Sequence, residues 1–187
     1  MSNVSMNDTT YEDILQFWFN ELTPQQWWAK DDSLDARIRK RFGVIHAQAA
    51  RCELFDWRMA AKGRLAEIII LDQFSRNIYR NQPQSFANDS LALALAQEAL
   101  AVEADKALSI EERSFLYMPF MHSESPAIHK IAVTLFSAEG MEQNLDFELQ
   151  HQRIIERFGR YPHRNQILGR ESTDEELTFL RQPGSSF

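Results

Sequence analysis

The densest group of residues that could do chemistry is a run of arginines and histidines near the C-terminus. Between His151 and Arg170 the chain has five arginines, no lysine and one acid, Glu156, so this segment has a formal charge of +4 in a chain of −7. A guanidinium group offers a planar pair of N–H donors that matches a carboxylate or a phosphate. The run therefore predicts a site for a small anion, held by arginines such as Arg160 and Arg164.

A second polar group lies between Leu71 and Arg80. Asp72, Arg76 and Arg80 recur every four residues, which places them on one face of a helix, and Asn77 lies beside them. If this face lines a groove, Arg76 orients an anion and Asp72 orients an arginine or a substrate hydroxyl. The same spacing is also typical of an ion pair on a solvated helix face.

A third group follows Pro119, which we expect to interrupt a helix because proline has no backbone N–H. His122 and Glu124 are then candidates for a base and the carboxylate that orients it. The alternative is a structural histidine at a helix end, hydrogen-bonded to backbone or to Glu124.

These three groups form one candidate site if the fold brings them together. The candidate catalytic residues are His122, His163 and Glu124. The candidate ligand-binding residues are Asp72, Arg76, Asn77, His122, Glu124, Arg160, His163, Arg164 and Arg170. A web of buried ion pairs to acids such as Asp89 and Glu171 explains the same arginines, and both interpretations stay open.

No metal site and no cofactor are predicted. Glu148 and His151 have the Glu-x-x-His spacing of a di-iron helix bundle, but no second such pair exists. The chain also has no phosphate-binding glycine loop, no dinucleotide-binding glycine motif and no pair of cysteines for zinc.

The elements that must position these residues are helices. The chain has 19 alanines and 18 leucines against four valines, and no strand-length alternation of apolar and polar residues stands out. Helical spacing and capping residues predict about nine helices. The expected ranges are 11–21, a short turn from 24, 32–51, 63–79, 89–103, 109–121, 125–140, 144–158, and a short last helix after a capping box at 172–175.

Short connections between these helices predict stacked antiparallel hairpins, an all-α, α-α superhelix. We expect one all-helical domain over residues 1–187, with residues 1–9 as a flexible N-terminal tail.

Composition excludes several classes of protein. Cys52 is the only cysteine, so no intrachain disulfide can form and a reducing, cytoplasmic location is expected. The longest stretch without a charged residue, Ser114–Ser123, is far shorter than the roughly 18 residues of a membrane span, so no membrane partner is expected. A net charge of −7 argues against a nucleic-acid partner.

The chain resembles an uncharacterised bacterial family known as domain of unknown function 924. The resemblance covers nearly the whole sequence and rests on four motifs: residues 14–19 (ILQFWF), 71–77 (LDQFSRN), 119–124 (PFMHSE), and 157–165 (RFGRYPHRN) with 168–173 (LGREST). It implies an all-helical fold similar to tetratricopeptide-like superhelices. It implies no activity, so no catalytic residue is carried over from it.

Two positions depart from the family pattern. Ser75 stands where proline is expected, which should let the helix around Asp72 continue undisturbed. His129 stands where glutamine is expected, so a titratable ring replaces a neutral amide. If residue 129 lines the site, this exchange changes the ligand preference.

The leading functional hypothesis is a domain that binds a small anionic or phosphorylated ligand in a groove. In it Arg160, Arg164 and Arg170 hold the anion, and His122 or His163 moves a proton. Two alternatives stay open: a tetratricopeptide-like scaffold that binds a protein partner, and a hydrolase or transferase acting on a phosphorylated or carboxylated metabolite.

Overall fold

A computed structural model describes residues 9–186, and every regular element in that range is helical. The expected flexible tail, residues 1–9, lies outside the described residues except for Thr9. Ten α-helices are present in the described range, and two of them, α4 and α5, are joined in one continuous helical run. The expectation of about nine helical units is therefore confirmed.

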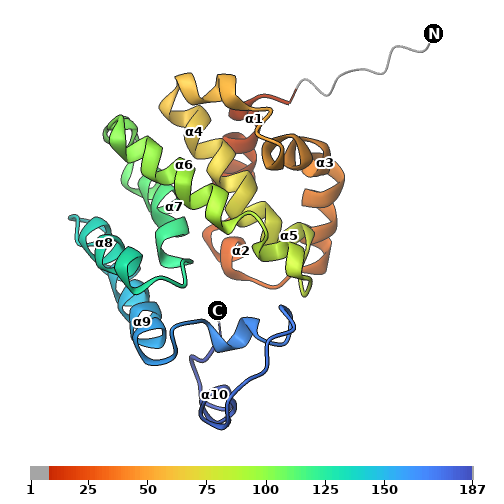
Figure 1. The fold of residues 1–187 in the computed structure, drawn as a ribbon. Coiled ribbons are helices and arrows are strands. Elements are labelled where there is room, and N and C mark those ends of the chain that lie inside the picture. The colour runs from red at the N-terminus through yellow and green to blue at the C-terminus, as the bar shows by residue number, and fades with distance from the viewer. Residues whose placement is uncertain (1–8, 187) are drawn as a thin grey trace.

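In the N-terminal half, α1 packs against α4, and α3 packs against the helical run that continues from α4 (Figure 1). The elements of this half are α1 (Tyr11–Gln16) with a π-helical extension (Phe17–Glu21), α2 (Pro24–Trp28), α3 (Asp32–Ala50), a 3-10 helix (Phe55–Met59) and α4 (Ala61–Ile69). Thr10 begins α1 through a reciprocal capping box with Asp13. Large aromatic side chains such as Trp18, Phe42, Phe74 and Phe115 fill the core between these helices.

The segment that carries Asp72 is a π-helical turn (Ile70–Phe74) between α4 and α5 (Ser75–Ile78). The helix does continue without a break, but the expectation of an undisturbed helix is wrong. The Ser75 hydroxyl donates to the Leu71 carbonyl at 2.6 Å, which is the acceptor that the Ser75 backbone N–H would use in a regular α-helix. The Ser75 hydroxyl thus supplies the hydrogen bond that the Leu71 carbonyl would otherwise lack in the wider π-helical turn.

The C-terminal helices follow one another as antiparallel hairpins along one side of the molecule (Figure 1). They are α6 (Asp89–Ala101), α7 (Ile110–Met121), α8 (Pro126–Phe136), α9 (Glu142–Phe158) and the short α10 (Asp174–Phe179). Consecutive helices from α6 to α9 pack against each other, an arrangement consistent with a superhelix. After α9 the chain turns back beneath α5 and the start of α6 (Figure 1).

Two local expectations are wrong. Pro119 lies inside α7 and does not interrupt it. The helix continues to Met121, and the residues on both sides of Pro119 are buried in the core, which holds this last turn in place. The last capping box is one residue later than expected: Thr173 and Glu176 form it, since the Ser172 hydroxyl accepts a hydrogen bond from Asn165 instead.

Within residues 9–186, no helix combines the length and the apolar character that a membrane span would need.

Candidate functional site

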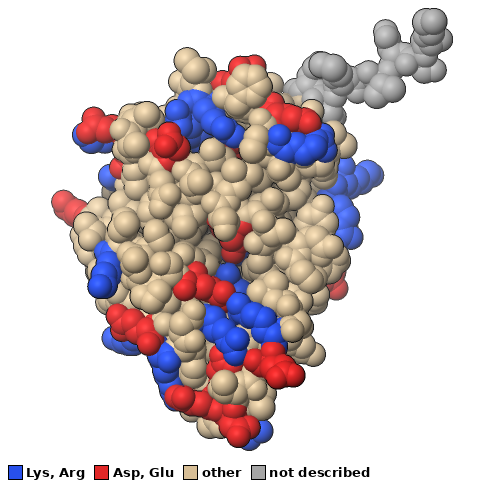
Figure 2. Space-filling view, in the orientation of Figure 1, with Lys and Arg blue, Asp and Glu red and all other residues tan. Residues whose placement is uncertain are grey.

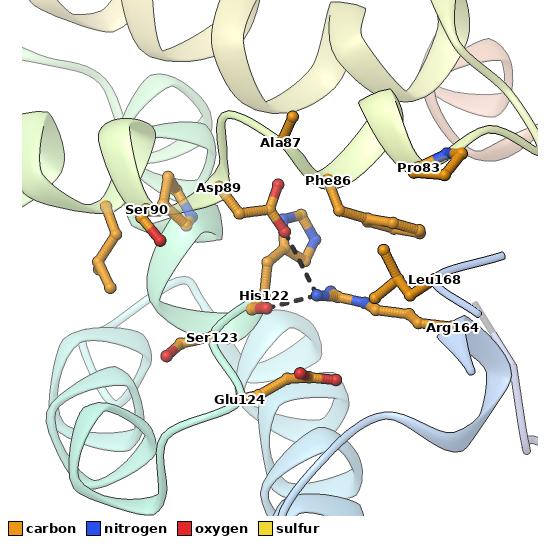
Figure 3. A pocket seen from close by; sticks show the side chains of 12 residues that line it. Pro83, Phe86, Ala87, Asp89, Ser90, His122, Ser123, Glu124, Arg164 and Leu168 are labelled. Carbon is orange, nitrogen blue, oxygen red and sulfur yellow. Dashed lines mark hydrogen bonds and ion pairs between the residues drawn. The ribbon is translucent and has the colours of Figure 1, made fainter. Parts of the chain in front are cut away.

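Two of the three polar groups line one pocket of about 300 Å³, and the remaining group contacts the lining residues through Asp72 and Arg76 (Figure 3). The pocket opens on the face where arginine and carboxylate side chains gather between α5 and the C-terminal segment (Figure 2). Its walls come from the 3-10 helix Pro83–Phe86, the start of α6, the end of α7 and the segment after α9. The lining residues are Pro83, Phe86, Ala87, Asp89, Ser90, Leu93, Pro119, His122, Ser123, Glu124, Arg164 and Leu168.

His122 lines this pocket at the C-terminal end of α7, and Asp72 lies behind it. The distance between His122 Nδ1 and Asp72 Oδ1 is 2.7 Å. Asp72 is 1% exposed, and its other oxygen accepts a hydrogen bond from the Gln73 amide at 2.6 Å. The carboxylate that orients His122 is therefore Asp72, and not Glu124 as the sequence suggested.

Asp89 lies between two guanidinium groups. Arg76 donates to both of its oxygens, at 3.0 and 3.1 Å, and Arg164 Nη1 donates to Oδ2 at 3.3 Å. Arg76 also contacts Asp72 at 3.2 Å, as its i,i+4 spacing predicts. The Arg164 guanidinium lies over the rings of Phe86 and Tyr161, with its carbon 4.7 and 4.6 Å from their centroids.

Glu124 and Arg170 form a separate bidentate pair at the edge of the pocket. Arg170 donates to the two Glu124 oxygens at 2.7 and 2.9 Å. Glu124 Oε1 also accepts from the backbone N–H of Tyr161 at 2.7 Å. Both side chains are thereby used to attach the C-terminal segment to the end of α7.

Three side chains hold the last carbonyls of α7, which have no partner inside the helix. The Tyr161 hydroxyl donates to the Met121 carbonyl at 2.5 Å, and Arg164 Nη2 donates to the His122 carbonyl at 3.0 Å. His129 Nε2 contacts the Ser123 carbonyl at 2.8 Å. The backbone on both sides of His122 is consequently fixed from two other parts of the chain.

The surrounding charges set the protonation of the site. Burial raises the pKa of Asp72, but Arg76 and His122 lower it by more, so Asp72 is ionised. Burial lowers the pKa of His122 below its ordinary value of 6.5, against the opposing attraction of Asp72, so the ring is neutral at pH 7. Burial and then Arg76 lower the pKa of Arg164, which nevertheless stays protonated.

Three of the predicted site residues lie elsewhere. Asn77 donates to Asp35 at 2.8 Å, and Arg80 also pairs with Asp35. Arg80, eight residues after Asp72, therefore does not join Asp72 and Arg76 at the pocket. Arg160 forms a bidentate pair with Glu176, at 2.7 and 2.8 Å. His163 packs its ring against that of Tyr161 and does not line the pocket.

Asp89 and Phe86, the two pocket residues that contact Arg164 through their side chains, were not predicted as site residues from the sequence. Asp89 stands at the start of a helix, where an acid is usually read as a cap, yet Asn88 holds the cap position. Phe86 belongs to a short polar connection whose only signal is Pro83 before it. Neither position has a spacing that points to Arg164, which lies 75 residues after Asp89.

His129 does not line the pocket either. It is completely buried, and its Nδ1 lies 2.6 Å from Oε1 of the equally buried Glu148. Its role is to connect α9 to the Ser123 carbonyl.

In the described range, no cluster of three or more His, Cys, Asp or Glu side chains has a geometry that could hold a metal ion.

Comparison with known proteins supports the family resemblance. A search of curated proteins finds no match to this chain. Among solved structures, a protein of unknown function from Agrobacterium tumefaciens, ATU0120, is 40% identical, with a TM-score of 0.87, over 91% of this chain and 96% of that one. Residues 14–184 match the family described as "Bacterial protein of unknown function (DUF924)". The chain therefore belongs to this bacterial family.

Proposed function

We propose that the pocket binds a small molecule with one carboxylate or phosphate group, and that Arg164 receives that group. The observation that carries this proposal is the incomplete pairing of a buried cation. The Arg164 side chain is 8% exposed, and its one carboxylate contact, at 3.3 Å, is to an Asp89 that Arg76 already engages with both oxygens. Among the described residues, nothing accepts a hydrogen bond from Arg164 Nε.

The balance of charged side chains around the pocket limits the ligand to a small number of negative charges. Around the pocket, three arginines (Arg76, Arg164, Arg170) face three carboxylates (Asp72, Asp89, Glu124), so the group as a whole is close to neutral. Attraction for an anion is therefore local to Arg164. A ligand with one anionic group fits this better than a polyanion such as a nucleotide.

The remaining walls fit the uncharged part of such a ligand. Phe86, Leu93 and Leu168 supply apolar surface, and Ser90 and Ser123 supply hydroxyl groups. A volume of about 300 Å³ is at the lower end of pockets that bind small molecules. The pocket thus favours a compact ligand with a short apolar body.

A thermal-melt screen at constant ionic strength tests the proposal, with acetate, butyrate, adipate, phosphate and sulfate as probes and chloride as the reference salt. A ligand at 100 times its Kd adds about 2.7 kcal/mol to the free energy of unfolding, which raises the Tm by several degrees. We expect one of these probes to raise the Tm selectively.

Arg164→Lys is the informative variant, because it keeps the positive charge but loses the planar fork, and its affinity should fall about tenfold or more. Arg80→Lys is the matched control, since Arg80 also pairs with a buried carboxylate but does not line the pocket. Equal Tm shifts in both variants, or no shift with any probe, would contradict the proposal.

A further inference from the structure

We infer that His122 is the general base of an ester-hydrolysing site, and that its substrate is a small carboxylic ester that carries one free carboxylate. This inference rests on the proposed binding of an anionic group at Arg164. It adds a chemical step that binding alone does not require.

The hydrogen bond to Asp72 determines which nitrogen of His122 carries the proton. An ionised carboxylate accepts hydrogen bonds and cannot donate, so at 2.7 Å the Nδ1 atom must donate to Asp72 Oδ1. In a neutral imidazole the other nitrogen, Nε2, then has a free lone pair. This is the tautomer that a general base requires.

Nε2 is the ring nitrogen of His122 that the described residues leave without a hydrogen bond. The side chain of His122 is 16% exposed and lines the pocket, and no described residue forms a hydrogen bond with Nε2. The charged groups near the ring are Asp72, Arg76 and Asp89, and burial keeps the ring neutral among them.

The ring is also held rigidly. Arg164 donates to the carbonyl of His122 itself, while Tyr161 and His129 hold the carbonyls of Met121 and Ser123. Fixed geometry of this kind is what proton transfer to a bound reactant needs. Arg164 thus contacts both the backbone of the base and the pocket that receives the carboxylate (Figure 3).

The step is a hydrolysis in which water is the only co-reactant. His122 Nε2 takes a proton from water as the water oxygen attacks the ester carbonyl carbon. The C–O bond to the alcohol then breaks, and the imidazolium returns the proton to the leaving oxygen. The products are the carboxylic acid and the alcohol, and His122 is neutral again. Asp72 is a positioning residue that stabilises the imidazolium formed on the way.

Mono-4-nitrophenyl adipate is the test substrate, and neutral 4-nitrophenyl butyrate is the comparison. We expect the protein to release nitrophenolate above the rate of heat-denatured protein, with the higher kcat/KM for the carboxylated ester. His122→Asn should lower kcat/KM by about 100-fold or more. His151→Gln, at a buried histidine that does not line the pocket, should leave it within about threefold.

Asp72→Asn tests the positioning role through the pH profile. Asparagine can still accept from Nδ1, but it removes the negative charge that favours the imidazolium. Both kcat and the apparent pKa of the rising limb should therefore fall, whereas a merely structural role would lower kcat without moving the limb.

A measurement without variants accompanies these assays, in case a substitution prevents folding. Diethyl pyrocarbonate acylates neutral, accessible imidazole, so His122 and His163, the two histidines that are not buried, should be modified before the other three, and adipate should protect His122. No turnover of either ester, activity retained in His122→Asn, or loss confined to His163→Asn would overturn the inference. A Tm increase with adipate in the absence of turnover would leave the binding proposal standing and remove only the catalytic step.

Discussion

At the scale of single residues, the partner of each arginine is decided by three-dimensional position and not by spacing. Arg76 and Arg80 are four residues apart on adjoining turns, yet Arg76 pairs with Asp72 and Asp89 whereas Arg80 pairs with Asp35. Asp89 is the acid that two guanidinium groups share, the buried Arg164 and the partly exposed Arg76. Removing its charge leaves both cations facing each other.

Asp89→Asn should therefore lower the free energy of unfolding by about 1.5–3 kcal/mol, because the buried Arg164 loses its carboxylate while Asp89 itself is 17% exposed. Urea denaturation at pH 7 measures this. Glu53→Gln is the matched control, because the Arg51–Glu53 pair is exposed and a pair of that kind contributes about 0–1 kcal/mol. If the two variants lost similar stability, the Asp89 cluster would not be a buried network.

At the scale of elements, the end of α7 is the point to which the rest of the site is attached. His129 Nε2 donates to the Ser123 carbonyl, so its Nδ1 and the Glu148 carboxyl share one proton. Burial raises the pKa of Glu148, and the hydrogen bond with His129 opposes that increase. The ring thus bridges two hydrogen-bonding partners, the Ser123 carbonyl and the Glu148 carboxyl, and a glutamine side chain can also bridge two partners.

His129→Gln should accordingly cost less than about 1.5 kcal/mol, since both hydrogen bonds can form again. His129→Leu should cost about 2–5 kcal/mol, because it leaves two buried polar groups without partners. Urea denaturation of the two variants provides the comparison. Equal losses would mean that packing, and not hydrogen bonding, makes residue 129 important.

At the scale of the whole molecule, several buried histidines make the stability depend on pH. Burial is the main cause that lowers the pKa of His151 to about 3 and of His163 to about 4, and it also lowers the pKa values of His46 and His122. An unfolded histidine titrates near 6.5. Below that pH the unfolded chain binds more protons than the folded one. The contribution of these histidines to the free energy of unfolding is therefore complete above pH 6.5 and is lost as the pH falls.

The free energy of unfolding should therefore fall steeply between pH 7 and pH 5. His151 alone accounts for about 2 kcal/mol of that fall, from 1.36 kcal/mol per pH unit below 6.5. In His151→Gln the difference between the two pH values should be smaller by this amount, as urea denaturation at both pH values can show. An unchanged difference would mean that His151 is not neutral in the folded protein.

Sequence alone determined the helical class, because composition, apolar spacing and capping residues act over a few neighbouring residues. The capping box at Ser109 and Glu112 and the ends of the helix at 110–121 are examples. It also singled out the arginine-rich segment and His122 as chemically unusual. Expectations that depended on a distant contact were less accurate: Glu124 as the partner of His122, and Asn77 and Arg160 as pocket residues.

Only the tertiary structure decided which polar groups meet. The Asp72–His122 contact joins residues 50 positions apart, and the Arg164–Asp89 contact joins residues 75 apart. No local pattern encodes such pairs, because they depend on how whole helices pack. The same packing decided that Arg164 is buried with one shared carboxylate while Arg160 pairs fully with Glu176. Residue type made both arginines candidates, and burial with incomplete pairing distinguished one of them.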